Sequence, residues 1–283
     1  NCTPPLGGRR FNMREELERA AARLRDTEER RIAAVVGGGL CGLACAQELA
    51  ARGFAVLVID PMPPGEAPAS SAAAGLLDAV SPKGRLMWRG LEAYDTARGL
   101  MDRCAQGQPD DEAPYWPLGM LHVPSTDKQA AQYREAAAVV GEAEALGCRY
   151  VESDEACAIA PGAVLPRGGL LSPFGLVVDS GTYLRALWRL VRATTPAEWL
   201  RRRVGSTHQL AALFDVVCLA PGAGCSSIEE SRHLPIDLSR GQLLEYDMPP
   251  PPATPPPPAA PPPGEEATAA QPAPLTASPP LAS

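Results

Sequence analysis

The spacing of apolar residues changes character at residue 32. Between Phe11 and Arg31 the apolar positions recur every three to four residues, which predicts one amphipathic helix. The stripe consists of Met13, Leu17, Ala20, Ala21 and Leu24. From Ile32 to Val36 every position is apolar, as in a strand buried on both faces of a parallel sheet. We therefore expect an N-terminal helix that is solvated and leans on the body, with docking or targeting as the alternative role.

A second buried strand follows the first at the distance of one βαβ unit. Glycines end the first run, a helix is predicted over Leu43 to Arg52, and a second apolar run spans Ala55 to Ile59 and stops at Asp60. The whole unit has about 30 residues, the usual length of this motif. A parallel sheet with a helical crossover is therefore predicted at the start of the core.

Further elements are predicted in the middle of the chain. Thr126 and Gln129 have the spacing of a capping box before a helix over Ala130 to Leu146, which Gly147 ends. A short apolar run over Leu176 to Asp179 predicts a strand.

The alternation of helix and strand continues toward residue 220. Ser180 is the expected cap of a helix over Thr182 to Arg192, and Phe214 to Ala220 is a buried strand closed by Pro221. Alternating elements favour the α/β class over a helical bundle or a β-sandwich.

The amino-acid composition predicts a proline-rich tail and makes some classes of binding partner less probable than others. Of the 32 prolines among 283 residues, fifteen lie between Pro249 and Pro280, which predicts a disordered or polyproline II tail. Such a tail is a candidate ligand for SH3-like or WW-like domains, with a plain linker as the alternative. The net charge of −7 argues against nucleic acid as a partner, because phosphate binding needs clustered Lys and Arg. No apolar run reaches the length of a membrane span.

The number and spacing of the cysteines indicate the redox state of the compartment in which the protein is expected to function. None of the eight cysteines forms a CxxC pair or a Cys/His spacing suited to zinc, so no metal site is predicted and the thiols are expected to be reduced. The expected location is the cytoplasm or an organelle, a plastid or mitochondrion. The first residue is Asn1 rather than Met, so we expect a processed chain or a fragment whose targeting peptide is not readable.

The strongest chemical signal is the glycine-rich turn after the first strand. Residues 37–42 fit G-x-G-x-x-G, and Asp60 ends the next strand 18 residues after Gly42. Gly37 permits the tight turn, Gly39 lets backbone approach a pyrophosphate, and Gly42 lets helix and strand pack closely. Leu40 and Cys41, within the turn, are also assigned to the cofactor, and the N-terminus of the helix that follows offers N–H groups that favour phosphate. Asp60 suits a ribose hydroxyl and argues against a 2′-phosphate.

Two cysteines lie on the helix that follows this turn. Cys41 and Cys45 are four residues apart and share a helix face. We interpret them as small residues that allow close packing rather than as a redox pair, since redox pairs usually need a CxxC-like turn.

Residues 66–77 form a run of small side chains that suits backbone passing close to a flat ligand. Together with the βαβ unit, this run resembles the D-amino-acid oxidase and glycine oxidase family of FAD-dependent oxidoreductases, in which the matching stretch contacts the flavin end of FAD. The resemblance assigns that contact to Ser70, Ser71, Ala73, Ala74, Gly75 and Leu76.

Later segments match the family in its order and extend the resemblance to about residues 30–248. They are Gly119-Met120-Leu121, Leu176–Asp179, Phe214–Ala223, Leu234-Pro235-Ile236 and Arg240-Gly241-Gln242. By position, the resemblance also assigns Ala220 and Gly222 to the cofactor, and Val204 to a backbone contact with adenine. The adjacent Arg201-Arg202-Arg203 is interpreted as a solvated face.

The resemblance implies a Rossmann-like FAD-binding domain with a smaller α+β substrate domain. The expected boundaries are 1–30 for the helical extension, 31–110 and 176–233 for the FAD-binding domain, 111–175 for part of the substrate domain, 234–248 for the start of a further substrate-domain strand, and 249–283 for the tail.

The implied activity is hydride transfer to flavin from a C–H next to nitrogen in a small amine or amino acid. No catalytic residue is identified, and His122, His208 and His233 fall in no motif. After Tyr246 the chain has proline where the family has an arginine for the substrate carboxylate and a final glycine-rich turn, so the chain is expected to be C-terminally incomplete and a weak flavin binder or inactive. The alternatives are a non-catalytic dinucleotide fold that displays a proline-rich tail, and an NAD-dependent dehydrogenase.

Overall fold

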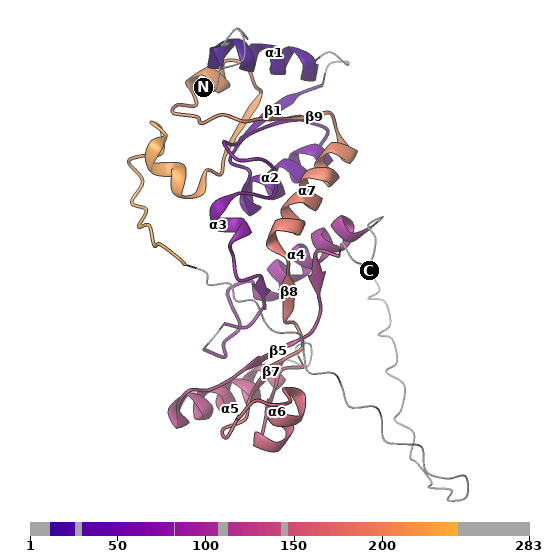
Figure 1. The fold of residues 1–283 in the computed structure, drawn as a ribbon, viewed down its shortest axis with the longest axis vertical. Coiled ribbons are helices and arrows are strands. Elements are labelled where there is room, and N and C mark those ends of the chain that lie inside the picture. Colours follow the sequence, from indigo (N-terminus) through magenta and orange to yellow (C-terminus); the bar gives the residue numbers. More distant parts are fainter. Residues whose placement is uncertain (1–11, 26–29, 82, 107–112, 143–146, 243–283) are drawn as a thin grey trace, which may run out of the picture. The chain divides into compact units, whose positions relative to one another are not determined.

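The computed structural model describes residues 12–25, 30–81, 83–106, 113–142 and 147–242. One sheet is parallel, with its strands in the order β10-β1-β2-β9. It lies in the upper part of Figure 1, beneath α1. The strands are β1 (Ile32–Val36), β2 (Ala55–Ile59), β9 (Ala197–Leu200) and β10 (Val216–Leu219). The first two match the predicted bounds and lie side by side, with β10 and β9 as parallel strands on either side of them. β10 lies within the strand predicted over residues 214–220, but it is shorter and only partly buried, and β9 was not predicted.

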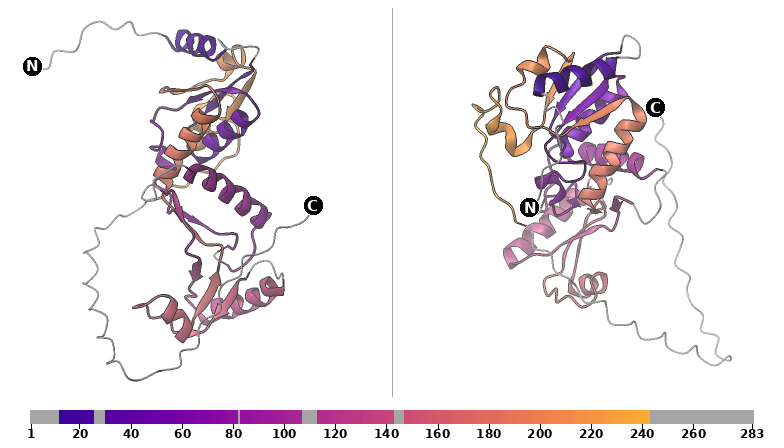
Figure 2. Two further views of the ribbon diagram at one scale, coloured as in Figure 1. Left: turned by 90° about the vertical axis from the view of Figure 1, so that its right-hand side faces the viewer. Right: turned by 45° about the horizontal axis from the view of Figure 1, so that its top comes forward.

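Helices cover both faces of this sheet (Figures 1 and 2). Alternate strand residues point to opposite sides, so Val35, Val56 and Val58 pack with α2 (Leu40–Ala51) and α7 (Ser180–Thr194). Leu57 and Ile59 face the other side, toward α1 (Met13–Arg25). The continuous apolar runs of the sequence follow from this double coverage.

Helix α1 is more than a solvated extension. Leu17 is 1% exposed, and Ala20, Ala21 and Leu24 are also buried against the sheet. Arg23 donates to Glu198 of β9. The expectation of a helix that merely leans on the body was wrong, because its apolar stripe closes one face of the sheet.

The structure also contains two small antiparallel sheets of three strands each. The first has the order β3-β8-β4, made of β3 (Leu76–Leu77), β8 (Leu176–Val178) and β4 (Tyr115–Trp116). The second has the order β5-β7-β6, made of β5 (Met120–His122), β7 (Gly169–Ser172) and β6 (Arg149–Val151). The remaining helices are α3 (Pro68–Ser71), α4 (Gly90–Ala105), α5 (Asp127–Glu142), α6 (Ser153–Ile159), α8 (His208–Ala211) and the 3₁₀ helix η2 (Gly222–Ser227).

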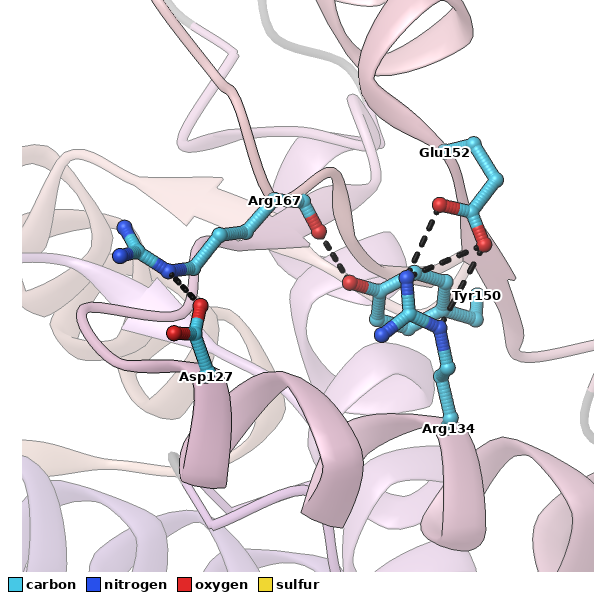
Figure 3. Close-up of polar contacts among 5 residues, drawn as sticks. All are labelled: Asp127, Arg134, Tyr150, Glu152 and Arg167. Atoms are coloured by element: carbon cyan, nitrogen blue, oxygen red, sulfur yellow. Dashed lines mark hydrogen bonds and ion pairs between the residues drawn. The ribbon is translucent and has the colours of Figure 1, made fainter.

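A network of hydrogen bonds and ion pairs joins α5 to β6 and to the loop that leads into β7 (Figure 3). The Arg134 guanidinium lies 4.2 Å from the centre of the Tyr150 ring and donates to Glu152 at 2.9 Å. The Tyr150 hydroxyl donates to the carbonyl of Arg167, whose side chain donates to Asp127 at 2.6 Å. Because these ion pairs are exposed to solvent, each contributes little to the free energy of folding, and their main effect is to orient α5 on its sheet.

Several predicted boundaries differ from the observed ones. Helix α2 begins at Leu40, three residues earlier than predicted, because the last residues of the glycine turn already belong to the helix. Helix α7 is capped by Asp179, whose carboxylate accepts the N–H of Thr182, and not by Ser180. One half of the predicted capping box before α5 forms, since the N–H of Gln129 donates to Thr126 Oγ1, while the Gln129 side chain accepts the N–H of Ser125 rather than that of Thr126. The end predicted for that helix, at residues 143–146, lies outside the described residues.

Leu234 begins the segment in which a further strand was expected. The structure assigns no strand to its described part, residues 234–242, and no backbone pairing with a sheet. Residues 243–283, which include the proline-rich tail, lie outside the described residues. Within the part of the chain that the structure describes, no helix is both long and apolar enough to cross a membrane.

Candidate dinucleotide site

The turn between β1 and α2 is built from close backbone contacts. Gly37 has a φ of +107° and donates its N–H to the carbonyl of Ile59 at 2.9 Å, and an added Cβ would lie 2.1 Å from the Ala220 carbonyl oxygen. A Cβ on Gly42 would lie 1.9 Å from the carbonyl oxygen of Gly37. Both distances are far below contact range, so only glycine fits, as the sequence predicts for these two positions.

The N-terminus of α2 retains free hydrogen-bond donors. The N–H of Leu40 donates to Ser70 Oγ at 3.2 Å, while Gly39, the residue before the helix, provides no side-chain cap. Within the described residues, the N–H groups of Cys41 and Gly42 have no hydrogen-bond partner. A helix start with open donors and the positive end of the helix dipole favours an anionic group.

Asp60 lies against this turn. One carboxylate oxygen accepts the N–H of Gly38 at 2.7 Å, and the other accepts the N–H of Met62 at 2.8 Å. Each oxygen has a further lone pair, so the carboxylate can still accept hydroxyl donors. The predicted acid is therefore held at the carboxyl end of β2, next to the glycines, as a ribose contact requires.

Trp199 is a neighbour of the turn that sequence reasoning missed. Its indole N–H donates to the carbonyl of Met62 at 3.0 Å, and a Cβ on Gly38 would lie 2.3 Å from its ring. The sequence around Trp199 does not indicate that its ring packs on the glycine turn, because this contact depends on β9 lying beside β2.

The small-residue run divides into two parts. Ser70 lies at the N-terminus of α2, the phosphate end of the turn, whereas the resemblance assigned it to the flavin end. Gly75, with a φ of +66°, accepts the N–H of Val178 at 2.6 Å, and a Cβ there would lie 2.0 Å from the Val178 carbonyl oxygen. Close approach to β8 is therefore one structural reason for this glycine. Leu76 is 63% exposed, and Ala73 and Ala74 are also exposed.

The later cofactor residues lie at the ends of β9 and β10. The N–H of Ala220 donates to Val36 at 2.8 Å, which sets the end of β10 beside the glycine turn. Gly222 begins η2 with a φ of +56°. Val204 lines a cavity of 530 Å³ on the α1 side, and no residue of the glycine turn lines it. The cavity residues are Met13, Leu17, Arg203, Val204, Gly205, Ser206, His208, Gln209, Leu210 and Glu229.

Three cysteines lie near the turn, Cys41 and Cys45 on α2 and Cys218 on β10. Burial first, and then the hydrogen-bonded thiol of Cys45, raise the pKa of Cys218 to about 11. A thiol with such a pKa is protonated at neutral pH and is a poor nucleophile. Cys41 is exposed, and all cysteines in the described part of the chain are free. Cys218 packs against the core, whereas Cys41 is exposed, so the packing role interpreted from the sequence does not hold for Cys41.

The comparisons with known proteins agree on one family. A family model described as FAD dependent oxidoreductase (DAO) matches residues 33–273. The tRNA 5-methylaminomethyl-2-thiouridine biosynthesis bifunctional protein MnmC of Chromobacterium violaceum is 32% identical over 232 residues, which cover 75% of this chain and 33% of that protein. The protein of the same name from Stutzerimonas stutzeri is 31% identical over 278 residues, or 85% of this chain and 38% of that protein. The chain thus spans little more than a third of these relatives.

Solved structures share the fold. Glycine oxidase from Geobacillus kaustophilus superposes with a TM-score of 0.60 at 20% identity, over 72% of this chain and 58% of that one. L-proline dehydrogenase from P. horikoshii gives a TM-score of 0.56 at 15% identity, over 75% of this chain and 58% of that one. At these identities the likeness concerns the fold alone.

Proposed function

Because the chain belongs to the FAD-dependent oxidoreductase family whose model matches residues 33–273, we propose that it binds FAD at the turn between β1 and α2 and takes part in oxidising an amine. FAD is the cofactor of this family. The observation that carries the proposal is the pairing of open N–H donors at the start of α2 with the carboxylate of Asp60 at the same turn.

The residues present fit the dinucleotide. Gly37 and Gly42 leave no room for a side chain in the turn, and the bare backbone of Gly39 faces Ser70. We assign the diphosphate to the N–H groups of Cys41 and Gly42 and to the Ser70 hydroxyl, and the ribose hydroxyls to Asp60.

We assign the other contacts by position. The flavin end would meet the backbone from Ser71 to Leu76, with Ala220 and Gly222 beside it, and adenine would meet the backbone of Val204. When bound, FAD supplies the acceptor for a hydride from the substrate. The chain's own part is to bind and orient the reactants, and we assign no side chain to proton transfer.

We propose as substrate a primary or secondary amine, with an amino acid as the first candidate. A second candidate is an aminomethyl group carried by tRNA, which the name of the relatives, a tRNA 5-methylaminomethyl-2-thiouridine biosynthesis protein, favours. The net charge of −7 counts against tight binding of RNA by this chain alone.

Titration of the full-length protein with FAD tests the cofactor assignment. We expect quenching of flavin fluorescence and an increase in the unfolding temperature with FAD, and neither with NAD⁺. Protection by NAD⁺ without protection by FAD would instead support a nicotinamide-dependent dehydrogenase. Protein that binds neither dinucleotide would support the non-catalytic alternative, in which the proline-rich tail is the functional part.

The substrate class is tested separately on FAD-loaded protein. Anaerobic addition of sarcosine, glycine or proline should bleach the flavin absorbance if a free amino acid is the substrate. Bleaching only by an aminomethyl-modified tRNA anticodon stem-loop would favour the second candidate.

A further inference from the structure

A buried polar cluster joins three segments outside the glycine turn. Asp78 directly follows β3, His122 ends β5 and Ser172 ends β7. Nε2 of His122 lies 3.0 Å from one carboxylate oxygen of Asp78, and Ser172 donates to the other at 2.8 Å. The side chains of His122 and Asp78 are 10% and 5% exposed, and Ser172 is fully buried.

Asp78 is the acceptor at the centre of the cluster. Its carboxylate also accepts the N–H of Val80 at 3.0 Å. Burial alone would raise its pKa, but the hydrogen bonds from His122, Val80 and Ser172 together keep the pKa of Asp78 below its usual value. Because Ser172 and His122 both bond to the carboxylate and not to each other, the cluster is not a serine nucleophile with its base.

The cluster holds the end of a segment that is proposed to meet the cofactor. Going back from Asp78, Leu77 pairs with Leu176 of β8, and Gly75 accepts the N–H of Val178. The backbone from Gly75 to Asp78 is therefore fixed at one end by a strand and at the other by a charged, water-excluded hydrogen-bond cluster. Between these two attachments Leu76 remains exposed.

We propose that Asp78, held by His122 and Ser172, is a positioning residue for the flavin end of the cofactor. The cluster orders residues 75–78 before FAD binds, so that the ordering entropy of this segment is not spent on binding. The inference rests on the proposed function, because it requires FAD to meet this segment.

The test compares His122→Phe with His122→Gln in the full-length protein. Phenylalanine keeps a ring but cannot donate to Asp78, whereas glutamine places an N–H donor at about the reach of Nε2. A matched control is Thr195→Val, which removes another buried hydrogen bond, from Thr195 Oγ1 to the carbonyl of Phe54 at 2.9 Å, without touching the segment. Hydrogen exchange of the cofactor-free protein reports the order of residues 75–80, and fluorescence titration reports FAD affinity.

We expect His122→Phe to speed exchange at residues 75–80 and to weaken FAD binding about tenfold or more, the scale of one hydrogen bond to a charged group. His122→Gln should restore both, and Thr195→Val should alter only the unfolding temperature. If His122→Phe speeds exchange but binds FAD as the wild type does, the positioning role is wrong while the cofactor assignment holds. If exchange at this segment is unchanged, the ordering role is wrong. If the wild type binds no FAD, the proposed function fails and this inference fails with it.

Discussion

Replacement of Asp60 by Asn is the most direct test of the cofactor site. The carboxylate accepts two backbone N–H groups, from Gly38 and Met62, at 2.7 and 2.8 Å. Asparagine keeps one acceptor oxygen, but its NH₂ group would face the second N–H donor. One charge-assisted hydrogen bond is lost in the free protein, which should lower the free energy of unfolding by about 1–3 kcal/mol.

The variant should also lose affinity for FAD. A carboxylate that accepts ribose hydroxyls contributes about 1.5–3 kcal/mol per bond, so Asp60→Asn should weaken FAD binding by at least about tenfold. The assay is fluorescence titration with FAD, together with denaturant unfolding of the cofactor-free protein.

Asp215→Asn is the matched control. Asp215 accepts the N–H of Ile32 at 2.8 Å, at the opposite end of β1 from the glycine turn. Asparagine keeps the one acceptor oxygen that Ile32 uses, so this variant should lower stability by no more than Asp60→Asn does and should leave FAD affinity unchanged. If Asp60→Asn binds FAD as tightly as the wild type, or if Asp215→Asn weakens binding equally, Asp60 does not hold the ribose.

Three further predictions address the turn, the buried cluster and the first helix. Gly42→Ala should lower the unfolding temperature and FAD affinity, because its Cβ would lie 1.9 Å from a backbone oxygen, whereas Gly99→Ala in α4, with no atom within 4 Å of its Cβ, should stabilise by about 0.5–1 kcal/mol. Asp78 has a lowered pKa, so its contribution to stability is present above about pH 4 and is lost as the pH falls through the folded-state value. The difference in unfolding free energy between wild type and Asp78→Asn should therefore be largest near pH 7 and should shrink as the pH falls below about 4, and a difference that does not change with pH would contradict the assignment. Leu17→Ala should cost about 2–5 kcal/mol in calorimetry or denaturant unfolding, since the side chain is 1% exposed, and a change below 1 kcal/mol would mean that α1 is not part of the core.

Local patterns predicted the elements of the site well. The two runs that became β1 and β2 were predicted with the observed bounds, because a strand covered on both faces leaves an unbroken apolar signature. The requirement for glycine at positions 37 and 42 was also predicted from the sequence, since the turn type and the close helix contact depend on only a few neighbouring residues. The cap of α7 was misplaced by one residue because Asp179 and Ser180 are both good caps, and only the three-dimensional geometry selects between them.

The sequence by itself determined the βαβ unit, the glycine turn and the acid at the end of β2, because periodicity and turn chemistry act over short distances along the chain. Only the tertiary structure decided that β9 and β10 flank this unit and bring Trp199 and Ala220 to the turn. It also decided that α1 closes one face of the sheet, and that Ser172 bonds to Asp78 across 94 residues. Such contacts depend on strand order and on desolvation in a shared core, and neither leaves a mark in the local sequence pattern.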